Sequence, residues 1–253
     1  MATSAPAAEL RAATALVFVT DLGSPLLSPD DAYHLGEVLR LKPGETVGAA
    51  DGAGSWRLCA FTGGSTRVRT ARGDRSNGGL EVTGPVQSIE RRLPLIEVGF
   101  SWAKAERTEW AVAKLVELGV DVLTPLVADR TIVRPDRQAA SRRGERLRRI
   151  VRESAMQSRR PFLPELCASC TVDEMVSSRT ASAVALAEPG GAPVSLSVPG
   201  VLIGPEGGWS PRELALAENL VGLGDGVLRV ETAAVTAGAL LCAMRCMAVA
   251  PPR

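Results

Sequence analysis

Two patterns of apolar and polar residues divide the chain of 253 residues into two parts. From Ala15 to about Gly84, short apolar runs are separated by turns that contain Gly, Pro, Asn or Asp, which is typical of β-strands. Many short strands close together in sequence predict a small barrel. The pattern predicts one short helix at Asp30–Leu39, a loose segment at residues 1–13, and strands at Leu16–Val19, Thr46–Ala50, Trp56–Phe61, Thr66–Thr70 and Leu80–Thr83.

After Pro85 the apolar runs alternate with longer amphipathic segments, so strands are expected to alternate with helices. The predicted strands are Leu93–Phe100, Val120–Leu126, Ala181–Ala187 and Val201–Ile203. The predicted helices are Glu106–Leu118, Arg142–Arg159, Val172–Ser178, one that begins at Pro211, and a last one after the turn at Leu228. This alternation predicts a parallel α/β sheet. We therefore expect a β-rich domain at residues 1–84, a linker at 85–92 and an α/β domain at 93–253.

The most informative segment is the pentapeptide Gly204–Gly208, which follows the apolar run Val201–Ile203. A helix is expected to begin directly after it, with Ser210 as the N-cap, Pro211 in the first position and Glu213 closing a capping box. A strand, a glycine-rich turn and a helix gather backbone N–H groups at one point, where glycine lets a ligand approach the main chain. The segment thus predicts a small-molecule site, with a plain strand–helix turn as the alternative.

A second glycine-rich segment, Val221–Gly226, permits another interpretation, namely the loop of a Rossmann-type enzyme. Such a loop begins a βαβ unit and is followed about 20 residues later by an acidic residue. Only 27 residues follow Gly226, they contain no acid beyond Glu231, and they leave no room for a second strand. The Rossmann interpretation therefore fails.

Several segments, in order along most of the chain, resemble one family. They are His34–Arg40 with Gly44 and Asp51–Gly52, Lys104–Val120, Glu153–Arg160 with Pro164, the pentapeptide Gly204–Gly208, and Leu228–Ala233. Together they are similar to the ribosomal RNA small subunit methyltransferase E family, the uridine-N3 methyltransferases of the knotted SPOUT superfamily. The resemblance implies a PUA-like RNA-binding β-barrel at residues 1–84. It also implies a SPOUT-type parallel sheet with a C-terminal trefoil knot at 93–253, and methylation of uridine N3 in 16S ribosomal RNA.

The resemblance also implies S-adenosylmethionine as the cofactor, bound in the knot by three loops, Leu186–Pro189, Ile203–Gly208 and Leu223–Thr232. Bare backbone groups in such loops can satisfy the adenine and ribose of the cofactor. Gly207 is expected to have a positive φ or a close contact, so Gly207→Val should abolish cofactor binding. The cofactor-binding candidates are Leu186, Glu188, Ile203, Gly204, Pro205, Glu206, Gly207, Gly208, Leu223, Gly224, Leu228, Arg229, Glu231 and Thr232.

Methylation at uridine N3 requires removal of a weakly acidic proton, or donors that stabilise negative charge on O2 and O4. Arginine suits the second role, because its planar guanidinium is always charged. Glu153 and Gln157 share a helix face at the i, i+4 spacing, where an ordinary side-chain pair is the alternative interpretation. The catalytic candidates, which the sequence does not rank, are Arg160, Glu153, Gln157 and Arg229, with Arg152, Glu206 and Glu231 as further possibilities.

A net charge of only +1 hides a strongly basic segment between Asp129 and Arg160, where eleven arginines stand against four acids. Such a segment favours a surface for a polyanion over an ordinary solvated helix face. Aromatic residues make up only 4% of the chain, so we expect RNA to be bound by contacts to phosphates rather than by base stacking. The RNA-binding candidates are Arg40, Arg142, Arg143, Arg146, Arg149 and Arg152.

The cysteines and the apolar C-terminal segment decide the remaining expectations. Cys167 and Cys170 lack a second closely spaced ligand pair, so no metal site is expected. No targeting signal or membrane span is found, which predicts a cytosolic protein. The final helix is apolar on nearly every face around Leu241, which predicts an obligate homodimer with this helix buried and Arg245 paired to a carboxylate or carbonyl at the interface.

Two other functions stay open from the sequence. One is a different knotted methyltransferase that acts on transfer RNA or on a ribose oxygen. The other is a ribosome-assembly protein that binds RNA without chemistry, which would keep the arginines but need no cofactor pocket. Titration with S-adenosylmethionine distinguishes the binding protein from the enzymes.

Overall fold

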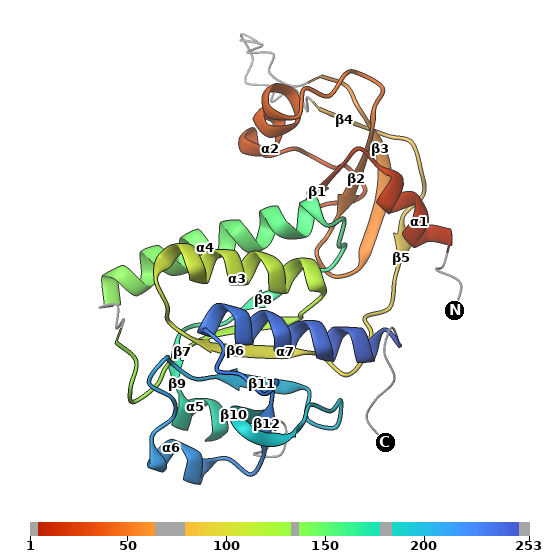
Figure 1. Ribbon diagram of the computed structural model, residues 1–253. Coiled ribbons are helices and arrows are strands. Elements are labelled where there is room, and N and C mark those ends of the chain that lie inside the picture. Colours follow the sequence, from red (N-terminus) through yellow and green to blue (C-terminus); the bar gives the residue numbers. More distant parts are fainter. Residues whose placement is uncertain (1–4, 64–78, 133–136, 178–183, 248–253) are drawn as a thin grey trace. The chain divides into compact units, whose positions relative to one another are not determined.

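A computed structural model of the chain (Figure 1) describes residues 5–63, 79–132, 137–177 and 184–247. The chain divides into two compact units. The first comprises Met1–Arg91 and Ala155–Leu163, and the second comprises Arg92–Ser154 and Pro164–Arg253. The predicted strand Thr66–Thr70 lies outside the described residues.

The first unit is built on a mixed sheet. Its strands are β1 (Ala15–Phe18), β2 (Thr46–Ala50), β3 (Ser55–Phe61), β4 (Leu80–Val82) and β5 (Gln87–Ser88). They run in the order β1-β2-β3-β4, and β5 also pairs with β3. The pair β1–β2 is parallel, whereas β3 is antiparallel to β2, β4 and β5. Four of the five predicted strands are thus present at or within one residue of the expected positions.

Three short helical segments belong to this unit: α1 (Ala5–Ala12), α2 (Pro29–Tyr33) and the π-helical turn η1 (His34–Val38). The expectation that residues 1–13 are loose is wrong for the span of α1. Leu10 of this helix is buried in a cluster with Leu16 and Trp56, and this contact holds the helix in place. The predicted helix at Asp30–Leu39 is present as α2 and η1, and it ends at Val38, shortly before Arg40, which has a φ of 54°.

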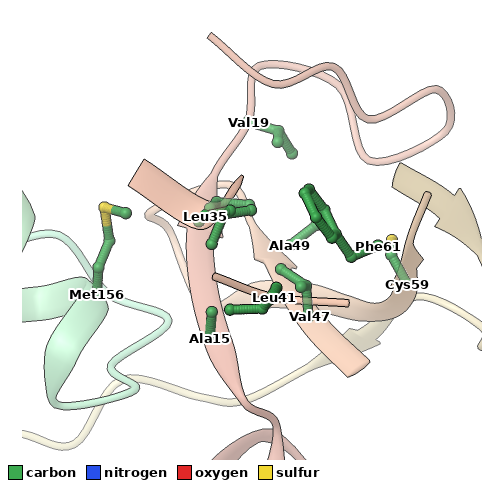
Figure 2. Packing of buried hydrophobic residues seen from close by; sticks show 10 residues of the cluster. Ala15, Val19, Leu35, Leu41, Val47, Ala49, Cys59, Phe61 and Met156 are labelled. Atoms are coloured by element: carbon green, nitrogen blue, oxygen red, sulfur yellow. The ribbon is translucent and has the colours of Figure 1, made fainter. Parts of the chain in front are cut away.

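The core of the first unit lies between the sheet and η1 (Figure 2), where Leu35, Val47 and Phe61 are almost completely buried. Met156, from the segment Ala155–Leu163, belongs to the same core. Arg159 holds this segment by donating hydrogen bonds to carbonyl groups, including those of Ala13 and Thr14. The segment therefore adds packing and polar contacts to a unit that otherwise comes from the start of the chain.

The second unit contains the predicted parallel sheet. Its strands are β6 (Glu97–Ser101), β7 (Val122–Val127), β8 (Glu165–Leu166), β9 (Cys170–Thr171), β10 (Val184–Pro193), β11 (Gly200–Ile203) and β12 (Leu220–Gly222). The order is β12-β10-β11-β6-β7-β8, with β9 also on β7, and every pair is parallel. Every residue of the central strands β6 and β11 is buried, as expected for a sheet covered on both faces.

Helices cover both faces of this sheet (Figure 1): α3 and α7 lie on one face, and α5 and α6 lie on the other. Their bounds, with the arginine-rich helix α4, are α3 (Ala105–Leu118), α4 (Arg137–Gln157), α5 (Val172–Ser177), α6 (Pro211–Leu216) and α7 (Val230–Arg245). The helices α3 and α7 approach closely at Gly238, where a Cβ atom would lie 2.6 Å from Cδ2 of Leu115. Small residues of α7 thus serve packing within the chain.

The final helix differs from the expectation in one respect. Leu241 is completely buried inside its own unit, whereas its neighbour Leu240 is 37% exposed. The Arg245 side chain is only 7% exposed, and it donates to the Asp121 carboxylate and to the carbonyl of Gly119. Its predicted pairing with a carboxylate or carbonyl is therefore confirmed, but both partners belong to the same chain. Within the described residues, no helix combines the length and apolarity needed to cross a membrane.

Candidate active site

A cavity of about 330 Å³ opens at the carboxyl ends of β11 and β12. Its volume lies in the range of small-molecule sites, and its position is the usual ligand site of parallel α/β sheets. The residues that line it are Ala187, Glu188, Pro189, Ile203, Gly204, Pro205, Glu206, Gly208, Trp209, Leu223, Gly224, Gly226, Val227, Leu228, Arg229, Val230 and Ala233. All except Trp209 and Ala233 come from the three loops predicted from the sequence.

Ten of the fourteen cofactor-binding candidates line this cavity, and four do not. Leu186 of β10 is buried, and it pairs with Leu202 on the adjacent strand β11. Thr232 is exposed on α7. Glu231 and Gly207 contact other parts of the unit, at Arg107 and Arg130 respectively. The ten that line it are Glu188, Ile203, Gly204, Pro205, Glu206, Gly208, Leu223, Gly224, Leu228 and Arg229.

The expectation that Gly207 has a positive φ or a close contact is wrong. These two features belong to the other two glycines of the pentapeptide. The positive φ of the pentapeptide belongs to Gly208, at 69°, and not to Gly207. A Cβ atom at Gly207 would meet only an ordinary contact, 3.4 Å from Cβ of Arg130. The close approach occurs at Gly204, where a Cβ atom would lie 2.9 Å from the Trp209 indole.

Trp209 connects two of the loops that form the cavity. Its side chain is 3% exposed, and its Nε1 donates to the carbonyl of Ala187 at 2.9 Å. Because the indole contacts Gly204 on one side and binds Ala187 on the other, it fixes the distance between these loops. A tryptophan directly after a glycine-rich turn is the sequence signal that could have identified this role.

The helix start after the pentapeptide is built as predicted. Ser210 Oγ accepts from the Glu213 N–H at 3.2 Å, and Glu213 Oε2 accepts from the Ser210 N–H at 2.8 Å. Pro211 occupies the first helical turn. The capping box is therefore confirmed, and it fixes the direction in which the chain leaves the cavity.

Of the four catalytic candidates, Arg229 lines the cavity, at the N-cap of α7. Glu153 is exposed on α4 and is not among the lining residues. Gln157 and Arg160 belong to the first unit, on the segment Ala155–Leu163. Arg229 is thus the candidate that the structure brings to the cavity.

A second, much smaller void lies next to the cavity, and Val230 lines both. The buried atoms Ser101 Oγ, Thr108 Oγ1 and Glu231 Oε2 have no hydrogen-bond partner among the described residues, and their side chains line this void. An unsatisfied buried hydroxyl lowers the stability of the fold.

Thr108→Val should therefore raise the free energy of unfolding by about 1 kcal/mol, because it removes an unsatisfied hydroxyl and keeps the side-chain shape. Thr124→Val is the matched control, since Thr124 Oγ1 donates to Oε1 of buried Glu97 at 2.9 Å. We expect this control to lower stability by roughly 1.5–3 kcal/mol. The midpoint temperature of thermal unfolding measures both effects, because a change of 1 kcal/mol in stability shifts this temperature by about 2–4 °C. Destabilisation by Thr108→Val would contradict this account.

The arginines of α4 divide into paired and unpaired side chains. Arg146 donates to both carboxylate oxygens of Glu109, at 2.5 and 2.7 Å, and this hydrogen bonding lowers the pKa of the Glu109 carboxyl. The Arg143 guanidinium lies 5.7 Å from the centre of the Trp102 ring. Arg142 and Arg149 are exposed, with no ion pair to any described residue. Of the remaining RNA-binding candidates, Arg152 is half-buried on α4 and Arg40 is exposed in the first unit.

Burial raises the pKa of the Cys167 thiol. Throughout the described part of the chain, no group of three or more His, Cys, Asp and Glu side chains could hold a metal ion.

A comparison with family models decides the class of this fold. The model described as RNA methyltransferase domain matches residues 91–242, which include every residue that lines the cavity. The chain belongs to this family of RNA methyltransferase domains. The family resemblance noted in the sequence is thereby confirmed.

The similarity to curated relatives of this RNA methyltransferase domain covers more of the chain than residues 91–242. A protein of Synechocystis is 29% identical over 83% of this chain and 70% of its own length. A protein of Mycobacterium tuberculosis is 28% identical over 82% of both chains. Each is named ribosomal RNA small subunit methyltransferase E.

Solved structures share the fold of this RNA methyltransferase domain. A putative methyltransferase of Legionella pneumophila, solved with its bound cofactor SAM, is 25% identical, with a TM-score of 0.74 over 90% of this chain and 96% of its own. A probable rRNA-methyltransferase of Porphyromonas gingivalis is 26% identical, with a TM-score of 0.71 over 93% and 100%. The similarity therefore spans both units.

Proposed function

We propose that this protein transfers a methyl group from S-adenosylmethionine to N3 of a uridine in 16S ribosomal RNA. The observation that carries the proposal is the glycine-rich cavity at the carboxyl ends of β11 and β12, inside the segment that matches the family. The names of the curated relatives support ribosomal RNA of the small subunit as the substrate. The choice of N3 follows from the family that the sequence segments resemble.

The residues of the cavity fit the cofactor. Gly208 and Gly224 line it, and a Cβ atom at either position would meet nothing within 4 Å, so both leave open space over bare backbone. Leu228 supplies apolar surface for an adenine ring, and the Glu188 carboxylate supplies negative charge for a sulfonium or ammonium group. When bound, S-adenosylmethionine supplies an electrophilic methyl group.

The residues of the chain then have to bind the acceptor and manage its charge. Arg229 lines the cavity, so we assign to it the stabilisation of negative charge on uracil O2 or O4. A positioned donor of this kind contributes about 2.7–4 kcal/mol to the transition state. Glu206 lines the same cavity and is our candidate acceptor for the N3 proton. Arg160, Glu153 and Gln157 stay candidates for contacts to the acceptor from outside the cavity.

Mass spectrometry of ribosomal RNA from cells with and without the gene tests the reaction. We expect one N3-methyluridine of the small subunit to disappear without the gene. An unchanged uridine pattern together with a lost methyl group in transfer RNA, or on a ribose, would identify another knotted methyltransferase. Failure of the purified protein to bind S-adenosylmethionine by calorimetry would favour the RNA-binding assembly protein.

We also propose that α4 binds RNA phosphates. Replacing Arg142 and Arg149 together by alanine should reduce the slope of log affinity against log salt by about 1–2 units and leave cofactor affinity unchanged. The double variant Arg143→Ala/Arg146→Ala is the control, because it removes the same formal charge but from side chains held by Trp102 and Glu109. Equal slopes for the two double variants would show that only total charge matters.

The division of the chain into domains is also a proposal. We propose that residues 1–84 form a PUA-like RNA-binding barrel, that 85–92, which contain β5 of the first unit, link it to the rest, and that 93–253, apart from the segment Ala155–Leu163, form the knotted domain. The three loops that converge on one cavity support the knot. We infer a homodimer that pairs through the exposed side of α7, in the cytosol, with the acceptor uridine held between the cavity of one subunit and the barrel of the other.

A further inference from the structure

The chain makes a tight turn directly after β7, at residues 128–131. The Ala128 N–H donates to Thr131 Oγ1 at 2.9 Å, and the Thr131 N–H donates back to the Ala128 carbonyl at 3.1 Å. These two bonds leave Asp129 and Arg130 at the tip of the turn. Both side chains are directed to the pentapeptide loop and the helix that follows it.

Arg130 binds the pentapeptide loop at its fourth residue, Gly207. Its Nη1 donates to the carbonyl oxygen of Gly207 at 3.0 Å. The Cα of Gly207 also lies close to the Arg130 side chain, since a Cβ atom there would be 3.4 Å from Arg130 Cβ. Gly207 does not line the cavity, but Glu206 and Gly208 on either side of it do. Arg130 thus holds the loop from the side that faces away from the cavity.

Asp129 binds the end of the same loop. Its N–H donates to Glu213 Oε1 at 2.9 Å, and its carboxylate accepts from Ser210 Oγ at 2.5 Å. Arg212 adds a bidentate ion pair, with Nη2 at 2.9 Å and Nε at 3.1 Å from the Asp129 carboxylate, and it also reaches Asp173. The hydrogen bond from Arg212 lowers the pKa of the Asp173 carboxyl.

We propose that Arg130 is a positioning residue for cofactor binding, and not one of the arginines that contact RNA, although it belongs to the same basic segment. The proposal rests on the proposed function. The pentapeptide contains three glycines, so its own side chains cannot fix its conformation. A charge-assisted hydrogen bond to the Gly207 carbonyl, with Asp129 bound to Ser210 just after the loop, restricts it to the shape that the cavity needs.

Calorimetric titration of Arg130→Ala with S-adenosylmethionine tests the assignment. We expect cofactor affinity to fall by about 10-fold, the effect of losing one charge-assisted hydrogen bond. Arg130→Lys should recover most of it, because lysine also carries a donor. In turnover assays the cofactor KM should rise, with kcat at saturating cofactor unchanged. The salt slope for a 16S ribosomal RNA transcript should stay that of the wild type.

The matched control is Arg142→Ala, an exposed arginine of the same basic segment. It should reduce the salt slope and leave cofactor affinity unchanged, which is the opposite of Arg130→Ala. The proposal is overturned if Arg130→Ala binds the cofactor normally, if it reduces the salt slope as Arg142→Ala does, or if Arg130→Lys is as weak as Arg130→Ala. Absence of cofactor binding by the wild type would instead overturn the proposed function itself, and this proposal with it.

Discussion

Gly204→Val should reduce affinity for S-adenosylmethionine by about 100-fold or more. The new Cβ atom would lie 2.9 Å from Cε2 and 3.1 Å from Cδ2 of Trp209, inside van der Waals contact. The indole cannot move away freely, because it is buried and its Nε1 is bound to the Ala187 carbonyl. Relief of the clash must therefore displace two loops that line the cavity. Overpacking of this kind also costs roughly 1–3 kcal/mol of stability.

Gly207→Ala is the matched control for this prediction, because it changes the same pentapeptide where a Cβ atom meets only an ordinary contact. Its cofactor affinity should stay within about threefold of the wild type, since a surface change without a clash alters free energies by about 0.5 kcal/mol. Calorimetry measures both affinities, and circular dichroism verifies the fold. Similar losses in the two variants would mean that the close approach is not at Gly204.

Local signals in the sequence predicted the elements that surround the cavity. The Ser210–Glu213 capping box is a contact between near neighbours, so two residue types at a fixed spacing suffice to predict it. The parallel sheet follows in the same way from apolar runs that alternate with amphipathic helices. Helix α1 could not be predicted like this, because it depends on Leu10 reaching Trp56, which is distant in sequence.

The site was predictable to the level of loops but not of single side chains. Glycine-rich turns after strands indicated where the backbone is bare, yet the sequence does not say which glycine of the pentapeptide has the positive φ. Ala233 was missed because an apolar residue in a helix has the same local pattern whether it faces a cavity or a core. The ion pair between Arg146 and Glu109 joins two helices that are separate in sequence. The sequence therefore does not show that Arg146 differs from the other arginines of α4 in its availability to bind RNA.

Helix α7 is the clearest case in which composition alone misled. Its apolar residues on all sides suggested that Leu241 lies at a subunit interface, but Leu241 packs into its own chain. What the fold leaves uncovered here is Leu240 of α7, at 37% exposed, and Met247, which lies two residues beyond the end of α7, at 77% exposed. These two side chains are the apolar surface near the end of α7 that the proposed homodimer would have to cover. The homodimer we propose therefore has to be tested at Leu240.

Leu240→Asp should convert the proposed homodimer to monomers without unfolding the chain. In a monomer this side chain already contacts solvent, so a carboxylate is tolerated there. In a dimer the carboxylate would be buried without a partner, at a cost of several kcal/mol, which raises the dissociation constant about 100-fold or more. Sedimentation velocity at micromolar concentration measures the change. Leu26→Asp, at a 49% exposed leucine in the first unit, is the control and should stay dimeric. A wild-type protein that sediments as a monomer would refute the homodimer, whereas Leu241→Asp would only disrupt the core.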